Sequence, residues 1–246
     1  MEFTVNYDLK IFKSLNELSD YFALELKRLV DSTQSKFNLT LSGGSTPKFI
    51  FKYLSENFSD KINWNKINFF WGDERCVLPT DEESNYKMAY DNFFSKISVP
   101  GNNIFRIKGE DDPEFEAKRY SDVISKMLPL QNQLPVFDLI MLGLGEDGHT
   151  ASIFPDQMHL LNSSDICSVA THPTTKQKRI TITGKAINSA RHVVFIVTGK
   201  NKSKIADNIL NFSIDSNKYP ASFINPVNGK LSWLLDKEAA SLLKGN

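Results

Sequence analysis

The chain has 246 residues and a formal net charge of zero, from 29 basic and 29 acidic side chains. A balanced charge makes nucleic acids and anionic membranes unsuitable partners, so any bound anion needs a local cluster of donors. The hydrophobic fraction of 41% and the charged fraction of 24% are typical of a water-soluble globular protein. The length is enough for one large α/β domain or for two small ones, and one domain over residues 1–246 is expected.

The cysteines and the apolar runs predict a cytoplasmic location. Cys76 and Cys167 are far apart and have no metal-like spacing, so they imply no disulfide framework. Residues 1–8 lack a basic segment followed by an apolar stretch, and no apolar run approaches membrane-spanning length. We therefore expect no membrane contact. The expected assembly is a monomer or weak homodimer.

The N-terminal part of the chain predicts an amphipathic helix, a short strand and a second helix. Apolar residues recur at helical spacing from Leu15 to about Gln34, and Ser14 suits the N-cap. Residues 37–41 read as a strand. The second helix is expected to turn these side chains inward: Phe49, Ile50, Tyr53 and Leu54.

A glycine-rich turn joins that strand to the second helix. It contains Gly43, Gly44 and Ser45, and then Thr46 as the expected N-cap before Pro47 at the first helical position. Free backbone N–H groups at a helix N-terminus favour a phosphate. A plain tight turn explains the two glycines equally well, and the Gly-Lys-Ser/Thr ending of a nucleotide P-loop is missing.

The next predicted strand, residues 67–71, leads to a charged corner at the same sheet edge. Arg75 can pair with a phosphate or a substrate carboxylate, while Asp73 and Glu74 can hold the arginine or accept sugar hydroxyls. The alternative is a surface salt-bridge cluster. A helix is expected over residues 84–94.

The middle of the chain leads to a buried strand and a distinctive loop. Residues 104–107 predict a short strand, and Pro113 opens a helix that ends before Pro129. The apolar run 136–142 then reads as a buried strand. In an open α/β sheet, ligands bind outside the carboxyl ends of the strands, so the following loop is expected to face a ligand.

That loop places Asp147 two residues before His149, between Gly143, Gly145 and Gly148. A carboxylate so near can orient an imidazole, and the glycines let the backbone approach a ligand closely. The alternatives are a histidine held by a backbone carbonyl and an aspartate that caps an Asx-type turn. The remaining histidines are expected to be structural: His159, His172 and His192.

Three more strands are expected, over residues 166–170, 179–183 and 192–197. Arg179 raises a geometric problem. If its strand runs parallel to the others, the arginine lies at the sheet edge opposite the site. Either the strand is antiparallel, or Arg179 is structural.

The last quarter of the chain predicts a basic corner and a closing helix. Lys200 or Lys202, at the corner before a helix, can reach an anion or simply be solvated. Residues 219–226 read as an edge strand, and residues 231–240 as a turn and a helix. Together the elements predict an α/β fold with a mostly parallel sheet and helices on both faces.

With these residues identified, the chain resembles the 6-phosphogluconolactonase family from about Asn38 to its C-terminal segment. Six motifs in this order make the resemblance specific: Leu-Ser-Gly-Gly-Ser-Thr-Pro (41–47), Trp-Gly-Asp-Glu-Arg (71–75), Ser-Asn-Tyr (84–86), the 143–155 loop, Arg-Ile-Thr-Ile-Thr (179–183) and the 199–202 corner. The resemblance implies a single Rossmann-like domain. It also implies hydrolysis of the sugar-phosphate lactone 6-phospho-D-glucono-1,5-lactone, in the oxidative pentose phosphate pathway, without metal or organic cofactor.

The resemblance also bears on single residues. It implies that Arg179 lies near the phosphate, which favours the antiparallel option, and that the basic residue of the corner is Lys202 rather than Lys200. Glu146 stands where relatives often carry proline, a loop change of small consequence.

The chemistry of a lactone suggests a role for each candidate. His149, neutral near pH 7, acts as general base on water, and Asp147 orients its ring. The backbone N–H groups of the Gly143–Gly148 loop, those of Gly145 and Gly148 among them, or the Arg75 side chain, can stabilise charge on the carbonyl oxygen. Substrate and phosphate binding are assigned to the rest: Gly43, Gly44, Ser45, Thr46, Asp73, Arg75, Arg179 and Lys202.

Three alternatives remain open. On the same fold, an isomerase or deaminase of amino-sugar phosphates would use Asp147 at C2 and His149 in ring opening, but deaminases usually continue towards Asn-Glu-Pro after the histidine. A sugar-phosphate sensor would usually carry a DNA-binding segment, and none is visible. A metal hydrolase could use Asp73, Asp147 and His149, although no His-x-x-x-His or comparable spacing is present.

Overall fold

A computed structural model describes residues 6–213 and 215–243. Its centre is a six-stranded sheet in which every neighbouring pair is parallel, in the order β1, β11, β10, β7, β2, β3. The strands are β1 (Asp8–Phe12), β2 (Phe37–Leu41), β3 (Ile67–Trp71), β7 (Leu139–Leu142), β10 (His192–Val197) and β11 (Lys230–Asp236). The α/β class with a mostly parallel sheet is confirmed.

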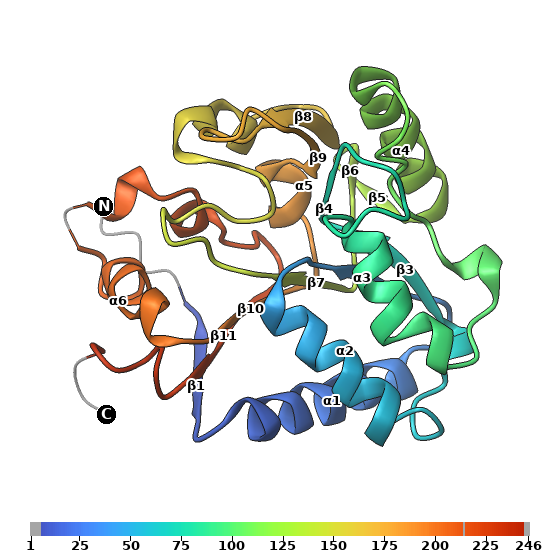
Figure 1. The fold of residues 1–246 in the computed structure, drawn as a ribbon, viewed down its shortest axis with the longest axis horizontal. Helices are drawn as coiled ribbons and strands as arrows, with labels where there is room; N and C mark the ends of the chain where they lie inside the picture. The colour runs from blue at the N-terminus through green and yellow to red at the C-terminus, as the bar shows by residue number, and fades with distance from the viewer. Residues whose placement is uncertain (1–5, 214, 244–246) are drawn as a thin grey trace.

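Helices cover both faces of this sheet (Figure 1). In the view of Figure 1, α1 (Leu15–Ser32) and α2 (Ser45–Asn57) lie below the sheet, whereas α4 (Pro113–Met127) and α5 (Gly184–Asn188) lie above it. The other α-helices are α3 (Asn85–Asn92), which packs on α2, and α6 (Ser203–Leu210). Short 3-10 helices are η1 (Trp64–Lys66), η2 (Phe94–Lys96), η3 (Gly101–Asn103), η4 (Pro155–Leu161), η5 (Lys200–Lys202), η6 (Ser216–Lys218) and η7 (Pro220–Phe223).

A second, antiparallel sheet lies above the carboxyl edge of the first (Figure 1). It contains β4 (Asp73–Arg75), β9 (Lys178–Ile182) and β8 (Cys167–Thr171), in the order β4, β9, β8. Arg75 is paired with Arg179 across β4 and β9. The strand that begins near Arg179 is therefore antiparallel. Of the two alternatives, an antiparallel strand or a structural Arg179, the structure has the first. A two-stranded hairpin, β5 (Leu130–Gln131) and β6 (Leu134–Pro135), precedes β7.

The strand order creates a crevice between β2 and β7. These strands are neighbours, but the chain leaves β2 through α2 towards β3 on one side, and leaves β7 towards β10 on the other. Right-handed crossovers that run in opposite directions place their connections on opposite faces of a sheet. The loops after β2 and β7 therefore diverge, which is the geometry of a ligand-binding switch point.

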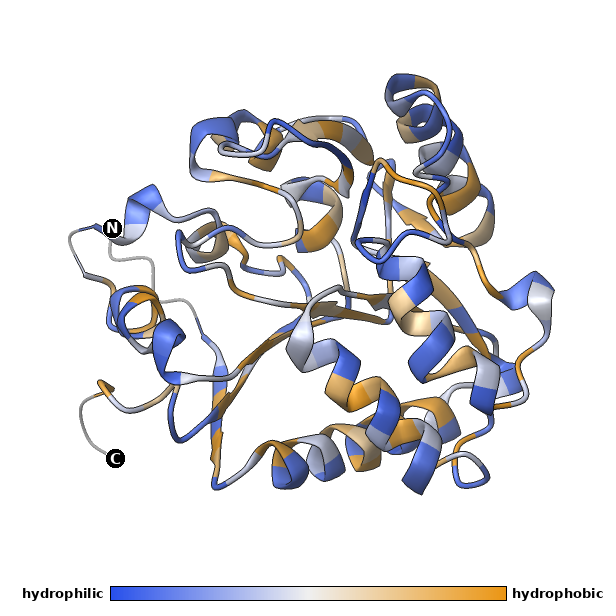
Figure 2. Ribbon diagram, viewed as in Figure 1, coloured by the Kyte–Doolittle hydropathy of each residue, from blue (hydrophilic) through white to orange (hydrophobic). Residues whose placement is uncertain are grey.

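The predicted helices and central strands are largely confirmed. Helix α1 buries an apolar stripe that includes Leu18, Phe22 and Leu26, and the Ser14 hydroxyl accepts a hydrogen bond from the Glu17 N–H at 3.2 Å. Figure 2 shows hydrophobic residues concentrated along the central strands. No helix in the described parts of the chain is both long and apolar enough to span a membrane.

The prediction for the C-terminal region was wrong. Residues 230–236 form β11, an interior strand between β1 and β10, where a turn and a helix were expected. Its run of apolar residues is buried, and the Trp233 ring stacks on Phe195 with centroids 4.0 Å apart. Residues 219–226 contain η7 and no edge strand. A strand that is buried on both faces lacks the alternation of polar and apolar residues. The sequence pattern therefore did not distinguish this strand from a buried helix.

Two further boundaries differ from the prediction. Residues 104–107 form no strand and contribute one bridge, between Ile104 and Phe69. Helix α2 begins at Ser45 with Gly44 as its N-cap, so Thr46 is inside the helix. The buried face also differs in part from the prediction, because Ile50 and Leu54 are buried as expected but Phe51 lies in the core while Phe49 is 37% exposed.

We predict that Trp233→Ala lowers the free energy of unfolding by about 3–5 kcal/mol, because it leaves a cavity against Phe195. Urea unfolding followed by circular dichroism measures the change. Leu78→Ala, at a side chain that is 62% exposed, is the control and should stay within about 0.5 kcal/mol of wild type. Equal effects of the two substitutions would contradict the packing role of β11.

Candidate active site

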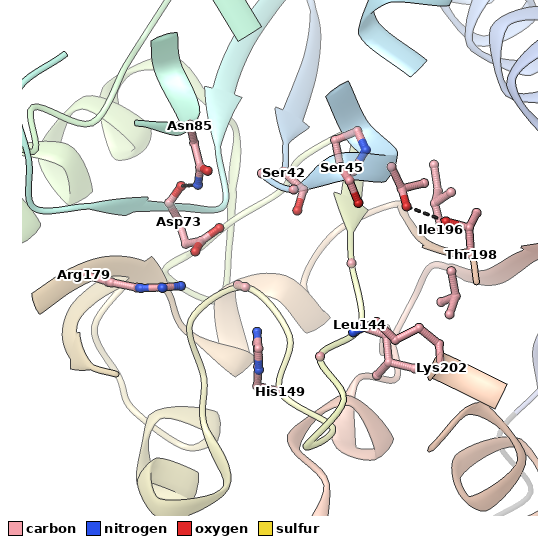
Figure 3. A pocket seen from close by; sticks show the side chains of 18 of the residues that line it. Ser42, Ser45, Asp73, Asn85, Leu144, His149, Arg179, Ile196, Thr198 and Lys202 are labelled. Carbon is pink, nitrogen blue, oxygen red and sulfur yellow. Dashed lines mark hydrogen bonds between the residues drawn. The ribbon is translucent and has the colours of Figure 1, made fainter. Parts of the chain in front are cut away.

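A pocket opens at the crevice between β2 and β7 (Figure 3). Its cavity has a volume of about 230 Å³ and is lined by the segments 42–47 and 143–145, with His149, Thr198 and Lys202 on the same rim. Asp73, Arg75 and Arg179 come from the small antiparallel sheet and close the opposite side. The structure therefore brings predicted site residues from five separate chain segments into one pocket, whereas Asp147 and Gly148 do not line it.

The loop after β7 holds Asp147 against His149. The Asp147 carboxylate lies 2.6 Å from Nδ1 of His149, and the same oxygen accepts the His149 backbone N–H at 3.1 Å. Gly148 adopts a φ of +82°, and a side chain at Gly145 would overlap the imidazole. The ring also packs on Phe154, with centroids 4.9 Å apart. The glycines are thus needed to bring the two catalytic candidates together.

The charge state of Asp147 follows from this contact. Burial disfavours ionisation of the carboxyl group, but hydrogen bonding to His149 and its charge outweigh burial and lower the pKa of Asp147. An ionised carboxylate can only accept, so Nδ1 carries the proton that it shares with Asp147. In the neutral ring, Nε2 is then the free acceptor.

The turn after β2 presents unpaired backbone donors to the pocket. Gly44 has a φ of +107°, and its N–H and those of Gly43, Ser45 and Thr46 have no acceptor in the described part of the chain. The Thr46 hydroxyl lies 2.6 Å from that of Thr198, which ties the turn to the end of β10. Unpaired donors at the start of a 13-residue helix form a site for an anion.

Lys202 lies at the same end of the pocket as this turn (Figure 3), whereas Lys200 does not line the pocket. Burial lowers the pKa of the Lys202 amine, and the carboxylates of Glu146 and Asp147 offset part of this effect. Among the described residues, no carboxylate lies within salt-bridge distance of its ammonium group. Lys202 is therefore a cation available to an incoming anion.

The opposite wall carries Asp73, Arg75 and Arg179. The buried Asp73 carboxylate accepts a hydrogen bond from the Ser152 hydroxyl at 2.6 Å, and the Arg75 guanidinium donates to the Glu83 carbonyl. Burial lowers the pKa of Arg179, although the charge of Asp73 acts in the other direction. In the view of Figure 3, Arg179 and Lys202 lie on different sides of His149.

Glu74 has a structural role and does not bind a sugar or an arginine. Its carboxylate accepts hydrogen bonds from the backbone N–H groups of Asn85 at 2.7 Å and Tyr86 at 2.8 Å, and from the Ser84 hydroxyl at 3.1 Å. Burial raises its pKa, while these backbone hydrogen bonds act in the opposite direction. Glu74 therefore caps the start of α3 and holds Asn85 at the pocket wall.

The expected backbone donors for an oxyanion are already used inside the loop. The Gly145 N–H donates to the His149 carbonyl at 2.8 Å, and the Gly148 N–H donates to the Gly145 carbonyl at 3.1 Å. Neither is free to bind a substrate oxygen in this conformation, so those two candidates are corrected. Of the donors that the sequence suggested, the other N–H groups of the Gly143–Gly148 loop and the Arg75 side chain remain candidates.

Two other reaction types find no support in the residues present. No group of three or more histidine, cysteine or acidic side chains in the described ranges is arranged to hold a metal ion. Burial raises the pKa of the Cys76 thiol to about 11, so this cysteine is not an activated nucleophile. The Asp147–His149 pair and the polar pocket wall offer acid–base and hydrogen-bonding chemistry.

Comparisons with known proteins agree with this geometry. A profile of the family described as glucosamine-6-phosphate isomerases/6-phosphogluconolactonase matches residues 13–233. A 6-phosphogluconolactonase of Haemophilus influenzae is 42% identical over 207 residues, which cover 84% of this chain and 87% of that protein.

Two solved structures have the same fold. The crystal structure of devB protein superposes with a TM-score of 0.93 at 38% identity, covering 97% of this chain and 100% of the other. For the 6-phosphogluconolactonase of Leishmania guyanensis the TM-score is 0.86 at 28% identity, covering 97% and 99%. By its profile, its sequence relatives and its fold, the chain belongs to the glucosamine-6-phosphate isomerase/6-phosphogluconolactonase family.

Proposed function

We propose that this protein hydrolyses 6-phospho-D-glucono-1,5-lactone to 6-phospho-D-gluconate, a step of the oxidative pentose phosphate pathway, with His149 as general base. The observation that carries the mechanism is the contact of 2.6 Å between His149 Nδ1 and an ionised Asp147, at the rim of a pocket with an anion site. The name of the Haemophilus influenzae relative supports the reaction.

The proposed reaction begins with a water molecule beside Nε2 of His149. The imidazole takes a proton from the water as its oxygen bonds to C1 of the lactone, and Asp147 stabilises the imidazolium that forms. The bond between C1 and the ring oxygen then breaks. The imidazolium returns the proton to the leaving ring oxygen, which leaves an open-chain acid that ionises to the carboxylate.

The phosphate is held far from the reacting carbonyl. Gly43, Gly44, Ser45 and Thr46 supply backbone N–H groups and hydroxyls, and Lys202 supplies a full positive charge. Such a remote grip limits the orientations of the lactone, so that C1 faces His149.

The other end of the pocket is proposed to receive the sugar ring and the carbonyl oxygen. Arg75 can stabilise negative charge on that oxygen, and Asp73 can accept from a ring hydroxyl. Arg179, for which the resemblance implies a place near the phosphate, supplies a second positive charge. Both arginines keep a buried Nε without a partner in the described residues. The wall is thus polar and incompletely paired before substrate binds.

We further propose that residues 1–246 form one domain that acts in the cytoplasm as a monomer or weak homodimer. The continuous core, the two free cysteines and the balanced charge support this proposal. Sedimentation velocity would distinguish these forms from a stable higher oligomer.

We predict that His149→Ala lowers the rate of lactone hydrolysis by about 10² or more, because the general base is removed. The loss of freshly prepared lactone is followed near neutral pH and corrected for spontaneous hydrolysis. His159→Ala, at an exposed histidine on η4, is the control and should keep the wild-type rate. Full activity of His149→Ala would make Asp147 the base to test. If wild type leaves the lactone untouched, glucosamine 6-phosphate is the next substrate.

Asp147→Asn is expected to lower kcat by at least about tenfold with little change in KM, because an amide neither fixes the tautomer nor stabilises the imidazolium. The substitution does not alter the residues that are proposed to bind the phosphate. Steady-state kinetics of the two proteins at several lactone concentrations separate the two constants. A rise in KM with normal kcat would instead assign Asp147 to substrate binding.

Lys202→Met is expected to weaken binding of 6-phosphogluconate by about tenfold or more, whereas Lys200→Met should bind as wild type does. Because burial lowers the pKa of Lys202, its positive charge is lost at a lower pH than that of an ordinary lysine. Wild-type affinity should therefore fall as the pH rises from about 7 towards 10, and Lys202→Arg should flatten this fall. Isothermal titration calorimetry measures each affinity. Equal effects at positions 200 and 202 would contradict the assignment.

A further inference from the structure

Asn85 is a buried pocket residue whose amide is only half paired. It is the first residue of α3, is 1% exposed, and lines the same cavity as Asp73 and His149. Its amide nitrogen donates to the Asp73 backbone carbonyl at 2.9 Å, whereas its Oδ1 is buried without a donor in the described residues. A buried acceptor without a donor is costly, so it calls for an explanation.

The orientation of this amide is determined by its neighbours. The Asp73 carbonyl can only accept a hydrogen bond, so the amide nitrogen must face it and the oxygen must face the other way. Figure 3 shows Oδ1 on the side of the amide that faces Ser42 and the pocket. Glu74 holds the backbone N–H of the same residue at 2.7 Å, so the start of α3 cannot easily turn away.

The glycine turn leaves room for this side chain. A Cβ atom at Gly43 would lie 1.9 Å from Asn85 Oδ1, so a side chain at position 43 would displace the amide. The absence of a side chain at position 43 therefore lets the amide lie against the turn, in addition to any contact with phosphate.

Buried polar atoms without partners gather on this wall of the pocket. Among the pocket residues these atoms are Nε of Arg75, Nε of Arg179 and Oδ1 of Asn85. Two are donors and one is an acceptor. The acceptor needs a donor from the ligand, and a phosphate or a carboxylate at neutral pH offers none.

We propose that Asn85 is a specificity-determining residue whose Oδ1 accepts a hydrogen bond from a ring hydroxyl of the substrate. This inference rests on the proposed lactonase function. The lactone carries hydroxyl groups only at C2, C3 and C4, because C1 is the carbonyl, the C5 oxygen closes the ring and the C6 oxygen carries the phosphate. One of these three hydroxyls is therefore the partner of Asn85.

The test compares the parent lactone with its 2-deoxy, 3-deoxy and 4-deoxy analogues on wild type and on Asn85→Ala. Wild type should lose about 10-fold to 100-fold in kcat/KM on the analogue that lacks the partner hydroxyl. On the parent lactone, kcat/KM of Asn85→Ala should be lower than that of wild type by a similar factor. On the analogue that lacks the partner hydroxyl, Asn85→Ala and wild type should have the same kcat/KM. Discrimination against the other two analogues should stay as in wild type.

Asn92→Ala is the matched control, since Asn92 lies at the other end of α3 and its amide donates to the Met88 carbonyl at 2.7 Å. It should leave all four rates unchanged. If Asn85→Ala does not fold, Asn85→Ser serves in the same comparison.

The proposal is overturned if Asn85→Ala lowers kcat/KM equally on all four lactones, which would indicate a structural role only, or if the parent rate is unchanged. A wild-type protein that accelerates none of the four lactones would instead refute the lactonase function, and the inference with it. The two failures are thus distinguishable.

Discussion

The pairing of β2 with β7 in one parallel sheet is the constraint on which the rest of the site depends. Thr40 is paired with Ile140 at this seam, and the two strands end at the same edge. One strand then leads to the glycine-rich turn before α2 and the other to the loop of His149. Because their connections leave to opposite faces, the sheet itself holds the unpaired N–H groups of the turn and the Asp147–His149 pair at the two sides of one crevice.

Close approach of backbone and side chain then shapes the site in detail. Gly145 leaves room for the imidazole of His149, and Gly43 leaves room for the amide of Asn85. Both glycines therefore allow a side chain of the site to pack closely against the backbone, in addition to allowing a tight turn. Gly44 and Gly148 have φ values of +107° and +82°, a backbone conformation that residues with a side chain rarely adopt. These two glycines let the chain turn sharply at the edge of the pocket.

Neighbouring carboxylates have different roles because their surroundings differ. Asp73 faces the pocket and is held by Ser152, whereas Glu74, one residue later on β4, points to the start of α3 and caps it. Alternation along a strand sends successive side chains to opposite faces. The same alternation separates the substrate-facing wall from the contacts that support it.

The sequence by itself determined the local chemistry: the amphipathic α1, the strands β2, β3 and β10, and the Asp147–His149 pair within one loop. It also indicated the family through motifs in a fixed order. Only the tertiary structure decided that residues 230–236 form a central strand, because burial on both faces removes the periodic signal. It likewise decided that Glu74 caps a helix, that the Gly145 and Gly148 N–H groups are occupied, and that Asn85 reaches the pocket. Those outcomes depend on which distant segments meet, and hydrogen-bond partners far apart in the chain leave no local pattern.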